Sequence, residues 1–491
     1  MGHGSSRGSL ELSGEGGMND NRVIGYLDHE TSSLNPFYGQ IIQTAAVAEK
    51  RGEVIGIFNE FAGMDPFRLL TPGSFISNKV PLHEIKNGQK LRVMLHKMDD
   101  FFRRVGPCVW FAHNAPFDFR HLYNGRYQNL TSPDFYTLKT AGNILCDSYQ
   151  LARSIYLTDP NAINVEINDE GVPIFTLESL CRQNNIELLN SHEAMQDALA
   201  LSELVSLMKS RSPENFESII RFSQKKLAQE RVRDQIFSMT DLGYGKNLRM
   251  APVVMMGKDS TGTRGLFLDL SKYSLTHQLP SVQEILKCLE GDDSGLPFAL
   301  IKLNESKIFF GIDHYALGDQ QKMIRKASHA RRNKALKEIC SQAVSIFCAY
   351  EKSEYVEEMI FESFPTFMER NFLDAFNSMA INEKHESISL FKGRLSSKRL
   401  LILAKRIIAA HYPDCYESQV IEEFHQWSLN RIFTNEEKPW MTFNKAEKEL
   451  SALKIEYSSD PFKHSRIREY ESYLHNDLKN LIGYGRSQKV V

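Results

Sequence analysis

The chain has 491 residues, of which 42% are apolar and 24% are charged, and its formal net charge is −2. It is too long for one ordinary hydrophobic core, so we expect two or three domains with the composition of a soluble globular protein. The longest apolar runs, at 400–403 and 407–410, are far shorter than the roughly 20 residues that cross a bilayer, which excludes a membrane-spanning protein.

The N-terminal residues and the cysteines indicate the cellular context. Residues 1–17 are rich in Gly and Ser and lack the apolar segment of a secretory signal, so we expect a vector-derived, disordered leader with Met18 as the native start. The seven cysteines are scattered and form no C-x-x-C pair. This pattern is typical of reduced thiols in a cytoplasmic protein and argues against a disulfide framework or a zinc site.

The first 200 residues contain both strand-like and helix-like segments. An apolar run at 22–27 predicts a buried strand that ends at Asp28. Strands at 41–48 and 54–61 are joined by a hairpin signal at Arg51-Gly52. The other expected elements are a turn at 70–73, a helical region at 80–105, a strand at 109–112, helices at 118–127 and 143–157, a loop at 168–173, and helices at 176–184 and 194–208. These segments predict a mixed α/β domain over residues 18–212.

The character of the chain changes after residue 212. A charged helix at 224–233 leads to short β-like runs between Gly, Ser and Thr turns, which predict a small β-barrel-like domain over residues 213–320. The β-like runs lie at 252–256, 266–270, 298–303 and 307–310. Residues 321–491 favour helix almost throughout, with breaks at Pro413 and Pro439, so we expect an all-α C-terminal domain.

Two stretches of the helical region are strongly basic. Residues 322–337 contain seven Lys or Arg residues and no acid, and residues 392–406 contain six and no acid. Such stretches favour a protein that holds a polyanion in cationic grooves. The ordinary alternative for each stretch is a solvated helix face.

Three short motifs contain the residue types that phosphodiester hydrolysis needs. Asp28 and Glu30 are two positions apart, which places both carboxylates on one face of a strand. Asp118 follows an apolar strand, and His192 precedes Asp197 at the start of a predicted helix. Mg²⁺ prefers hard oxygen ligands, and two ions about 3.5–4 Å apart stabilise the attacking and leaving oxygens of a phosphodiester. The imidazole of His192 is then a candidate general base for the attacking water.

Each motif alone has an ordinary structural explanation. An Asp-x-Glu pair is common at strand ends, Asn-Ala-Pro forms ordinary turns, and a histidine at a helix entry often precedes an acid. The occurrence of all three motifs in this order, in strand and helix contexts, favours the catalytic interpretation.

The motifs Asp28-His29-Glu30-Thr31, Asn114–Asp118 and His192–Asp197 resemble the three motifs of the DEDDh 3′→5′ exonucleases. Over residues 20–435 the chain is most similar to the bacterial exonuclease I family, while the last fifty residues match poorly. The segment 168–180 matches an acidic-Gly-x-Pro-x-Phe-x-Leu-Glu segment of that family. The resemblance implies a ribonuclease H-like exonuclease domain, a Src-homology-3-like β domain and a helical domain, arranged as a clamp around single-stranded DNA.

The resemblance also implies roles for the motif residues. It implies that Asp28, Glu30, Asp118 and Asp197 are metal ligands, that Glu30 also touches the terminal nucleotide, and that His192 is the general base. It further implies two Mg²⁺ ions as cofactors, with Mn²⁺ as a substitute.

Further positions are expected to contact the substrate. By the resemblance, Arg153 contacts the DNA backbone. At a position where the family segment can carry Arg, this chain has Thr176, whose hydroxyl can bond a phosphate without neutralising it. We expect Arg331, Arg332 and Lys334 of the first basic stretch to lie along the DNA path. The family's pairing with the acidic C-terminal tail of single-strand-binding protein is an alternative role for that stretch.

We therefore expect a monomeric, cytoplasmic, Mg²⁺-dependent exonuclease without a membrane partner. It would degrade single-stranded DNA from the 3′ end to 5′-mononucleotides in DNA repair or recombination. Same-class alternatives are a 3′→5′ exoribonuclease and a proofreading exonuclease, both of which are much shorter chains. A catalytically silent nucleic-acid-binding scaffold is the alternative from another class, and the presence of all five catalytic residues argues against it.

Overall fold

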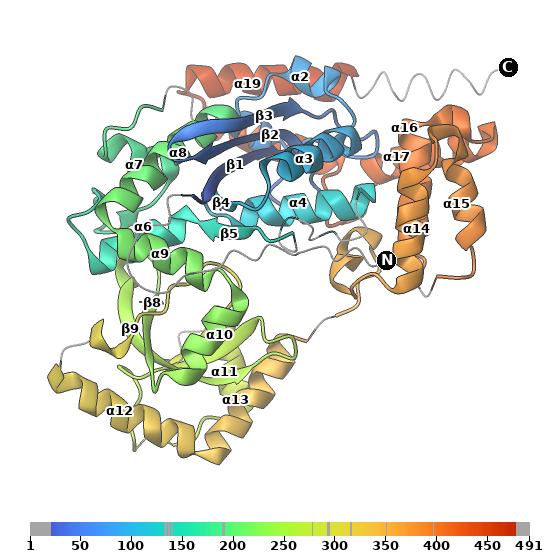
Figure 1. Cartoon of the computed structure of the whole chain (residues 1–491). Coiled ribbons are helices and arrows are strands. Elements are labelled where there is room, and N and C mark those ends of the chain that lie inside the picture. The colour runs from blue at the N-terminus through green and yellow to red at the C-terminus, as the bar shows by residue number, and fades with distance from the viewer. Residues whose placement is uncertain are drawn as a thin grey trace, which may run out of the picture.

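The computed structural model describes residues 21–477 except 132–134, 136, 137, 139, 140, 189–191, 277, 292–294, 315, 316, 350 and 396. The expected leader at 1–17 lies outside the described residues. Figure 1 shows a sheet with helices on both faces, a smaller β domain below it, and a group of helices beside it.

The first domain is built on a five-stranded mixed sheet of order β3-β2-β1-β4-β5. β1 (Val23–Thr31), β2 (Ile41–Lys50) and β3 (Glu53–Phe61) are antiparallel, while β4 (Val109–Ala112) and β5 (Ile144–Asp147) run parallel to β1. At the predicted β2–β3 hairpin, Arg51 and Gly52 both have positive φ, 55° and 80°. Positive φ at both turn residues matches the twist of the flanking strands.

Helices cover both faces of this sheet. On one face, α3 (Leu91–Val105) and α4 (Pro116–Asn129) share a buried core with β4, centred on Trp110. On the other face, α6 (Ser148–Thr158) and α8 (Ala194–Arg211) bury aliphatic side chains against β1 and β4. The predicted mixed α/β fold is confirmed, and it holds β1 between two helical layers (Figure 1).

Three local predictions for this domain were wrong. Residues 144–147, expected in a helix, form the edge strand β5, and the helix begins only at Ser148. The expected turn at 70–73 contains the start of α1 (Pro72–Ser77), because the Thr71 side chain caps the helix. The helical region 80–105 is divided into α2 (Leu82–Asn87) and α3 at Gly88, where a Cβ atom would lie 2.4 Å from the backbone nitrogen of Gly63.

Two helices and a second sheet follow. α9 (Pro213–Phe222) and α10 (Lys225–Asp234) lead into an antiparallel four-stranded sheet of order β11-β10-β9-β8, which is a curled half-barrel. Its strands are β8 (Ser238–Leu242), β9 (Arg249–Lys258), β10 (Arg264–Asp269) and β11 (Phe298–Lys302). The run expected at 307–310 contributes only an isolated bridge between Phe310 and Met239.

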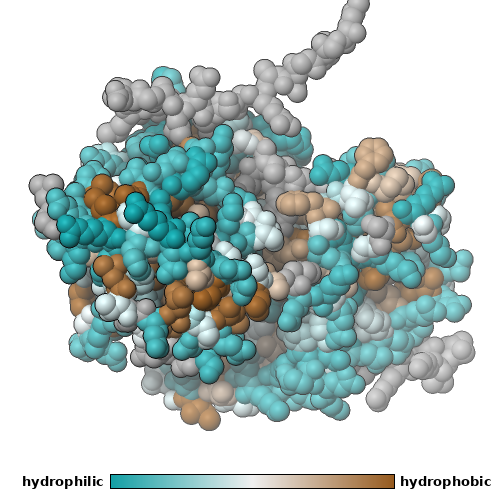
Figure 2. All heavy atoms as spheres, turned by 90° about the horizontal axis from the view of Figure 1, so that it is seen from below, coloured by the Kyte–Doolittle hydropathy of each residue, from teal (hydrophilic) through white to brown (hydrophobic). Residues whose placement is uncertain are grey.

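The helix between β10 and β11 and the helices after β11 divide into two groups. α11 (Val282–Leu289), α12 (Leu317–Arg332) and α13 (Lys334–Phe347) pack on the β domain, where Met323 and Leu336 join its core. Most of α12 and α13 was expected in the C-terminal domain, but their apolar faces are buried by β9 and β10. Figure 2 views the molecule from the side of these helices and shows mainly hydrophilic side chains, with the apolar ones in separate patches.

The remaining helices form the C-terminal region. α14 (Phe367–Ser378), α15 (Lys384–Phe391) and α16 (Arg399–His411) share a core with Tyr127 of α4. α17 (Ser418–Phe433) is followed by α18 (Phe443–Glu456) and α19 (Pro461–Ser472), which return to the first domain and pack against α1. Figure 1 shows α19 beside α2, at the top of the sheet. All seven cysteines are free, and no helix among the described residues is both long and apolar enough to cross a membrane.

Candidate active site

Two carboxylates project from the middle strand of the first sheet. Asp28 and Glu30 lie opposite Ala45 and Gln43 of β2, and their spacing places both on one face of β1. The strand continues to Thr31, so Asp28 lies inside β1 and not at its end as the sequence suggested.

The third carboxylate comes from the first turn of α4. The loop before this helix contains Asn114 with a φ of 62°, and its backbone N–H donates to Asp147 at 3.0 Å. Asp118 is buried and accepts a hydrogen bond of 3.1 Å from the backbone N–H of His29 on β1. This bond fixes the start of α4 against the strand that carries Asp28 and Glu30.

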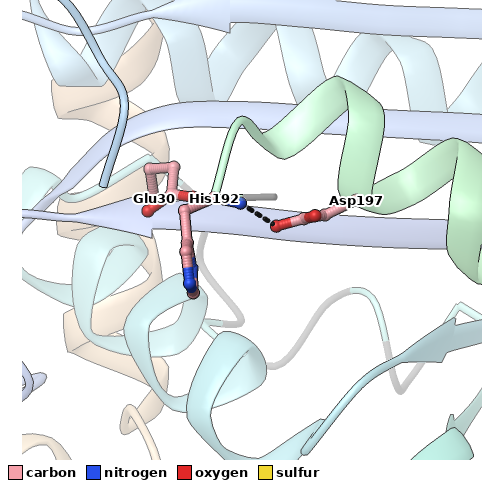
Figure 3. A group of neighbouring side chains, drawn as sticks. All are labelled: Glu30, His192 and Asp197. Atoms are coloured by element: carbon pink, nitrogen blue, oxygen red, sulfur yellow. Dashed lines mark hydrogen bonds between the residues drawn. The ribbon is translucent and has the colours of Figure 1, made fainter. Parts of the chain in front are cut away.

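The fourth carboxylate and the histidine come from the entry to α8. Asp197 lies in the first turn of the helix and accepts a 2.9 Å hydrogen bond from the backbone N–H of His192 (Figure 3). The carbonyl of His192 accepts a 2.8 Å bond from the backbone N–H of Lys79. His192 itself has a φ of 67°, a left-handed conformation that is uncommon for residues other than glycine.

The structure brings the predicted catalytic residues together. One side-chain oxygen each of Glu30 and Asp197 and a ring nitrogen of His192 lie within 4.8 Å of one another (Figure 3). Burial and then the charges of Asp118, Glu30 and Asp197 raise the pKa of Asp28 well above its ordinary value. Burial and the neighbouring acids likewise raise the pKa of Glu30, and the pKa of Asp197 rises to about 6. These shifts indicate a compact cluster of mutually repelling carboxylates.

Such a cluster fits divalent cations. Buried carboxylates are normally paired with a cationic group, yet the charges that dominate the surroundings of Asp28 are other carboxylates. Oxygen donors from Asp28, Glu30, Asp118 and Asp197 are the kind that Mg²⁺ or Mn²⁺ prefers. Two observations support this fit: the set of oxygen donors, and the mutual repulsion of these buried acids when no cation is bound.

The surroundings of His192 favour its neutral form. The side chain retains contact with solvent, but desolvation by the neighbouring protein lowers its pKa, and the charges of Lys79 and Lys463 lower it further. Glu178 opposes this effect. A neutral imidazole near pH 7 has a free nitrogen that can accept a proton.

Two acids near the site were not predicted from the sequence. Glu193 caps α8 by accepting the N–H of Gln196 at 3.3 Å, accepts a 3.0 Å bond from the Gln43 side chain, and raises the pKa of Asp197. Asp147 holds the loop before α4 through Asn114. The position of Glu193 directly after His192 was the available signal for the first acid, whereas Asp147 lay in a segment that was expected to be helical.

Among the predicted substrate-binding residues, Glu30 belongs to the carboxylate cluster, while Thr176 and Arg153 have partners within the protein. Thr176 is exposed and caps α7 (Leu177–Gln183), where its hydroxyl accepts the N–H of Ser179 at 3.3 Å. Arg153 is buried in an ion pair of 2.9 Å with Asp241 of β8. Its guanidinium thereby links α6 of the first domain to β8 of the second sheet.

The basic residues of α12 and α13 differ in their availability. Arg331 donates to the backbone carbonyls of Gln235 at 2.5 Å and Val232 at 3.3 Å, so its guanidinium joins α12 to the end of α10. Arg332 and Lys334 are exposed. Of the three residues predicted along a DNA path, these two have side chains open to a ligand.

The comparisons with known proteins agree with this site and fold. Residues 26–205 match the exonuclease family. Exodeoxyribonuclease I of Escherichia coli is 24% identical over 365 residues, which cover 69% of this chain and 75% of that protein. The structure of exonuclease I from Methylocaldum szegediense superposes with a TM-score of 0.77 at 17% identity, covering 95% of this chain and 99% of that one. The structure of Escherichia coli exonuclease I with a dA16 oligonucleotide gives 0.79 at 18% identity, covering 92% and 100%.

The acidic cluster and the match of residues 26–205 to the exonuclease family are those expected of an exonuclease, and the fold is that of the superposed exonuclease I structures. The chain is similar to exonuclease I over most of its length, which confirms the resemblance predicted from the motifs. The enzyme class that these similarities support is an exodeoxyribonuclease.

Proposed function

We propose that the enzyme is a divalent-metal-dependent exonuclease that removes 5′-mononucleotides from the 3′ end of single-stranded DNA in repair or recombination. The observation that carries the proposal is the convergence of Glu30, Asp197 and His192, whose ligand atoms lie within 4.8 Å of one another, on a buried cluster of further acids. A binding scaffold would gain nothing from this repulsive arrangement, whereas hydrolysis needs it.

The residues of the chain divide the work of hydrolysis. Asp28, Glu30, Asp118 and Asp197 would hold two Mg²⁺ ions, whose chemistry when bound would be to neutralise charge at the attacking and leaving oxygens. His192 takes the proton of the attacking water, because its lowered pKa keeps the ring neutral. The bond from the His192 N–H to Asp197 orients the loop that carries this base.

Single-stranded DNA is the proposed substrate because of the relatives. One of the superposed structures contains a dA16 oligonucleotide bound to exonuclease I, and another similar structure is described as SSB/exonuclease I. By that similarity we propose that single-strand-binding protein is a partner, and that the enzyme acts as a monomer in the bacterial cytoplasm.

A product analysis tests the proposal. Purified enzyme is incubated with 5′-labelled single-stranded DNA, duplex DNA and RNA, in Mg²⁺ or in EDTA, beside the Asp197→Asn variant. We expect a ladder that shortens from the 3′ end with single-stranded DNA in Mg²⁺, and no products in EDTA or with the variant. Faster degradation of RNA would favour the exoribonuclease alternative, and activity in EDTA would overturn the metal-dependent mechanism.

A further inference from the structure

The C-terminal helices contact the segment of the first domain that adjoins the His192 loop. Leu450 of α18 and Ile467 of α19 share a buried core with Phe75 of α1. The Glu449 side chain accepts the N–H of Gly73 at 2.8 Å, and the Tyr470 hydroxyl donates to the carbonyl of Leu70 at 2.6 Å. These contacts join residues that are 376 and 400 positions apart in the chain.

One buried side chain makes most of the polar contacts in this interface. The guanidinium of Arg466, on α19, donates to the carbonyls of Phe75 at 2.9 Å, Asn78 at 3.3 Å and Val80 at 2.8 Å, and it lies 3.6 Å from the centroid of the Phe75 ring. These carbonyls belong to the end of α1 and the turn after it. Carbonyls at a helix end lack partners within the helix, so Arg466 satisfies groups that would otherwise be buried without hydrogen bonds.

Lys79 lies between two of the residues that Arg466 holds. Its backbone N–H donates to the carbonyl of His192 at 2.8 Å. The left-handed φ of 67° at His192 is unfavourable for a residue other than glycine and persists only where the surroundings hold it. Two hydrogen bonds hold the backbone of this residue: its N–H donates to Asp197, and its carbonyl accepts from Lys79.

We propose that Arg466 is a positioning residue for the general base. It fixes the turn at 78–80, the turn fixes the Lys79 N–H, and this N–H holds the His192 backbone in the conformation that aims the imidazole at the carboxylate cluster. The inference rests on the proposed role of His192. It assigns a catalytic purpose to α19, which lies in the part of the sequence where the family resemblance is weakest.

The alternative is that Arg466 only stabilises the fold. A purely structural role would lower the melting temperature and the fraction of folded enzyme, but it would leave the turnover of each folded molecule unchanged. Positioning predicts a loss in kcat with little change in KM, because the general base acts on the attacking water and not on the binding of the strand. It also predicts faster amide exchange at Lys79 and His192.

The test compares Arg466→Ala and Arg466→Lys with Arg468→Ala, an exposed arginine on the same helix. Steady-state kinetics on single-stranded DNA are normalised to folded enzyme, and hydrogen exchange is followed over residues 75–80 and 192–197. We expect Arg466→Ala to lower kcat on the order of 10- to 100-fold and to accelerate exchange in both segments. Arg466→Lys should recover part of the rate, because an ammonium group can bond some of the three carbonyls, and Arg468→Ala should match the wild type.

An unchanged kcat in folded Arg466→Ala, or unchanged exchange at Lys79 and His192, overturns the inference. If Arg466→Ala does not fold, Arg466→Lys against Arg468→Lys decides it, and equal kcat values in that pair overturn it. His192→Ala separates this inference from the proposed function. Full activity in His192→Ala would refute the base assignment, while faster exchange in Arg466→Ala would still support the link from α19 to the loop.

Discussion

At the scale of single residues, the acids of the active site oppose folding while they enable catalysis. Burial and the charges of Asp118, Glu30 and Asp197 raise the pKa of Asp28, which means that each ionised carboxylate in this cluster destabilises the metal-free protein. Removal of one charge should therefore relieve repulsion in the folded state. This is the trade-off between stability and activity that is common at catalytic sites.

The first prediction follows for Asp118→Asn. In EDTA its melting temperature should lie a few degrees above that of the wild type, because one buried negative charge is gone while the side chain keeps its shape. Mg²⁺ should raise the melting temperature of the wild type more than that of the variant, and nuclease activity should be abolished while DNA binding is retained. Asp169→Asn, at an exposed position, is the control. Wild-type turnover by Asp118→Asn in Mg²⁺ would remove this residue from the site.

The second prediction concerns His192→Ala. Loss of a positioned general base should slow hydrolysis by roughly 10²- to 10⁴-fold, while binding of single-stranded DNA changes little because no phosphate-binding cation is removed. Single-turnover rates and a filter-binding assay measure the two effects. His83→Ala, at an exposed histidine, controls for the substitution itself. A near-normal rate in His192→Ala would place the base elsewhere.

At the scale of elements, the sequence predicted those with long, regular patterns and missed those that depend on distant contacts. The strands at 41–48 and 54–61 are rich in apolar residues and bounded by a hairpin signal, and both formed within two residues of the expected limits. β5 has four residues and was merged with the helix that follows, because such a short apolar run carries no clear period. The positions of α12 and α19 depend on packing against distant parts of the chain, which local sequence patterns do not reveal.

The same contrast applies to the site. The spacing of Asp28 and Glu30 required only the period of a strand, so the shared face could be predicted. The Lys79 bond to His192 and the Arg466 contacts join segments about 110 and almost 400 residues apart, respectively, for which no local pattern exists. For Arg331 the sequence predicted a contact with DNA from the basic run, but the run does not reveal that this side chain bonds backbone carbonyls within the protein.

The third prediction uses the difference in availability between Arg331, which bonds backbone carbonyls, and the exposed Arg332 and Lys334. If this face binds phosphates, Arg332→Ala with Lys334→Ala should flatten the slope of log K against log salt by up to about 0.7 for each phosphate that is no longer neutralised, because fewer counterions are released. Arg331→Ala should instead lower the melting temperature and leave the slope unchanged. Salt titrations of single-strand binding, with thermal melts of each variant, measure both quantities. An unchanged slope in the double variant would take this face out of the DNA path.

At the scale of the whole molecule, one buried ion pair joins the first domain to the C-terminal helices, and further buried pairs hold those helices to one another. Glu357 accepts bonds of 2.8 Å from both Arg406 of α16 and Arg431 of α17, and all three side chains are largely buried. The neighbouring Asp65 of the first domain pairs with His411 at 3.1 Å and with Arg68 at 3.1 Å. The Asp65–His411 pair joins the first domain to α16, and the Glu357 pairs hold α16 and α17 together beside it.

The last prediction is that Glu357→Ala loosens this arrangement. Removing one partner leaves two buried guanidinium groups unpaired, which costs on the order of 3–5 kcal/mol, whereas Glu357→Gln retains an acceptor and should cost less. Burial alone would raise the pKa of Glu357, but Arg406 and Arg431 lower it below the ordinary value of 4.5. The stabilisation is therefore complete above that pH and is lost as the pH falls through the lower pKa of the folded state.

Limited proteolysis between pH 3 and 7 should find the C-terminal helices cleaved first in acid, and in Glu357→Ala already at pH 7. Cleavage of a short oligonucleotide should persist in the variant while binding of long strands weakens, because the carboxylate site is intact and only the helical region has loosened. Equal loss of both activities would mean that this ion network supports the active site itself.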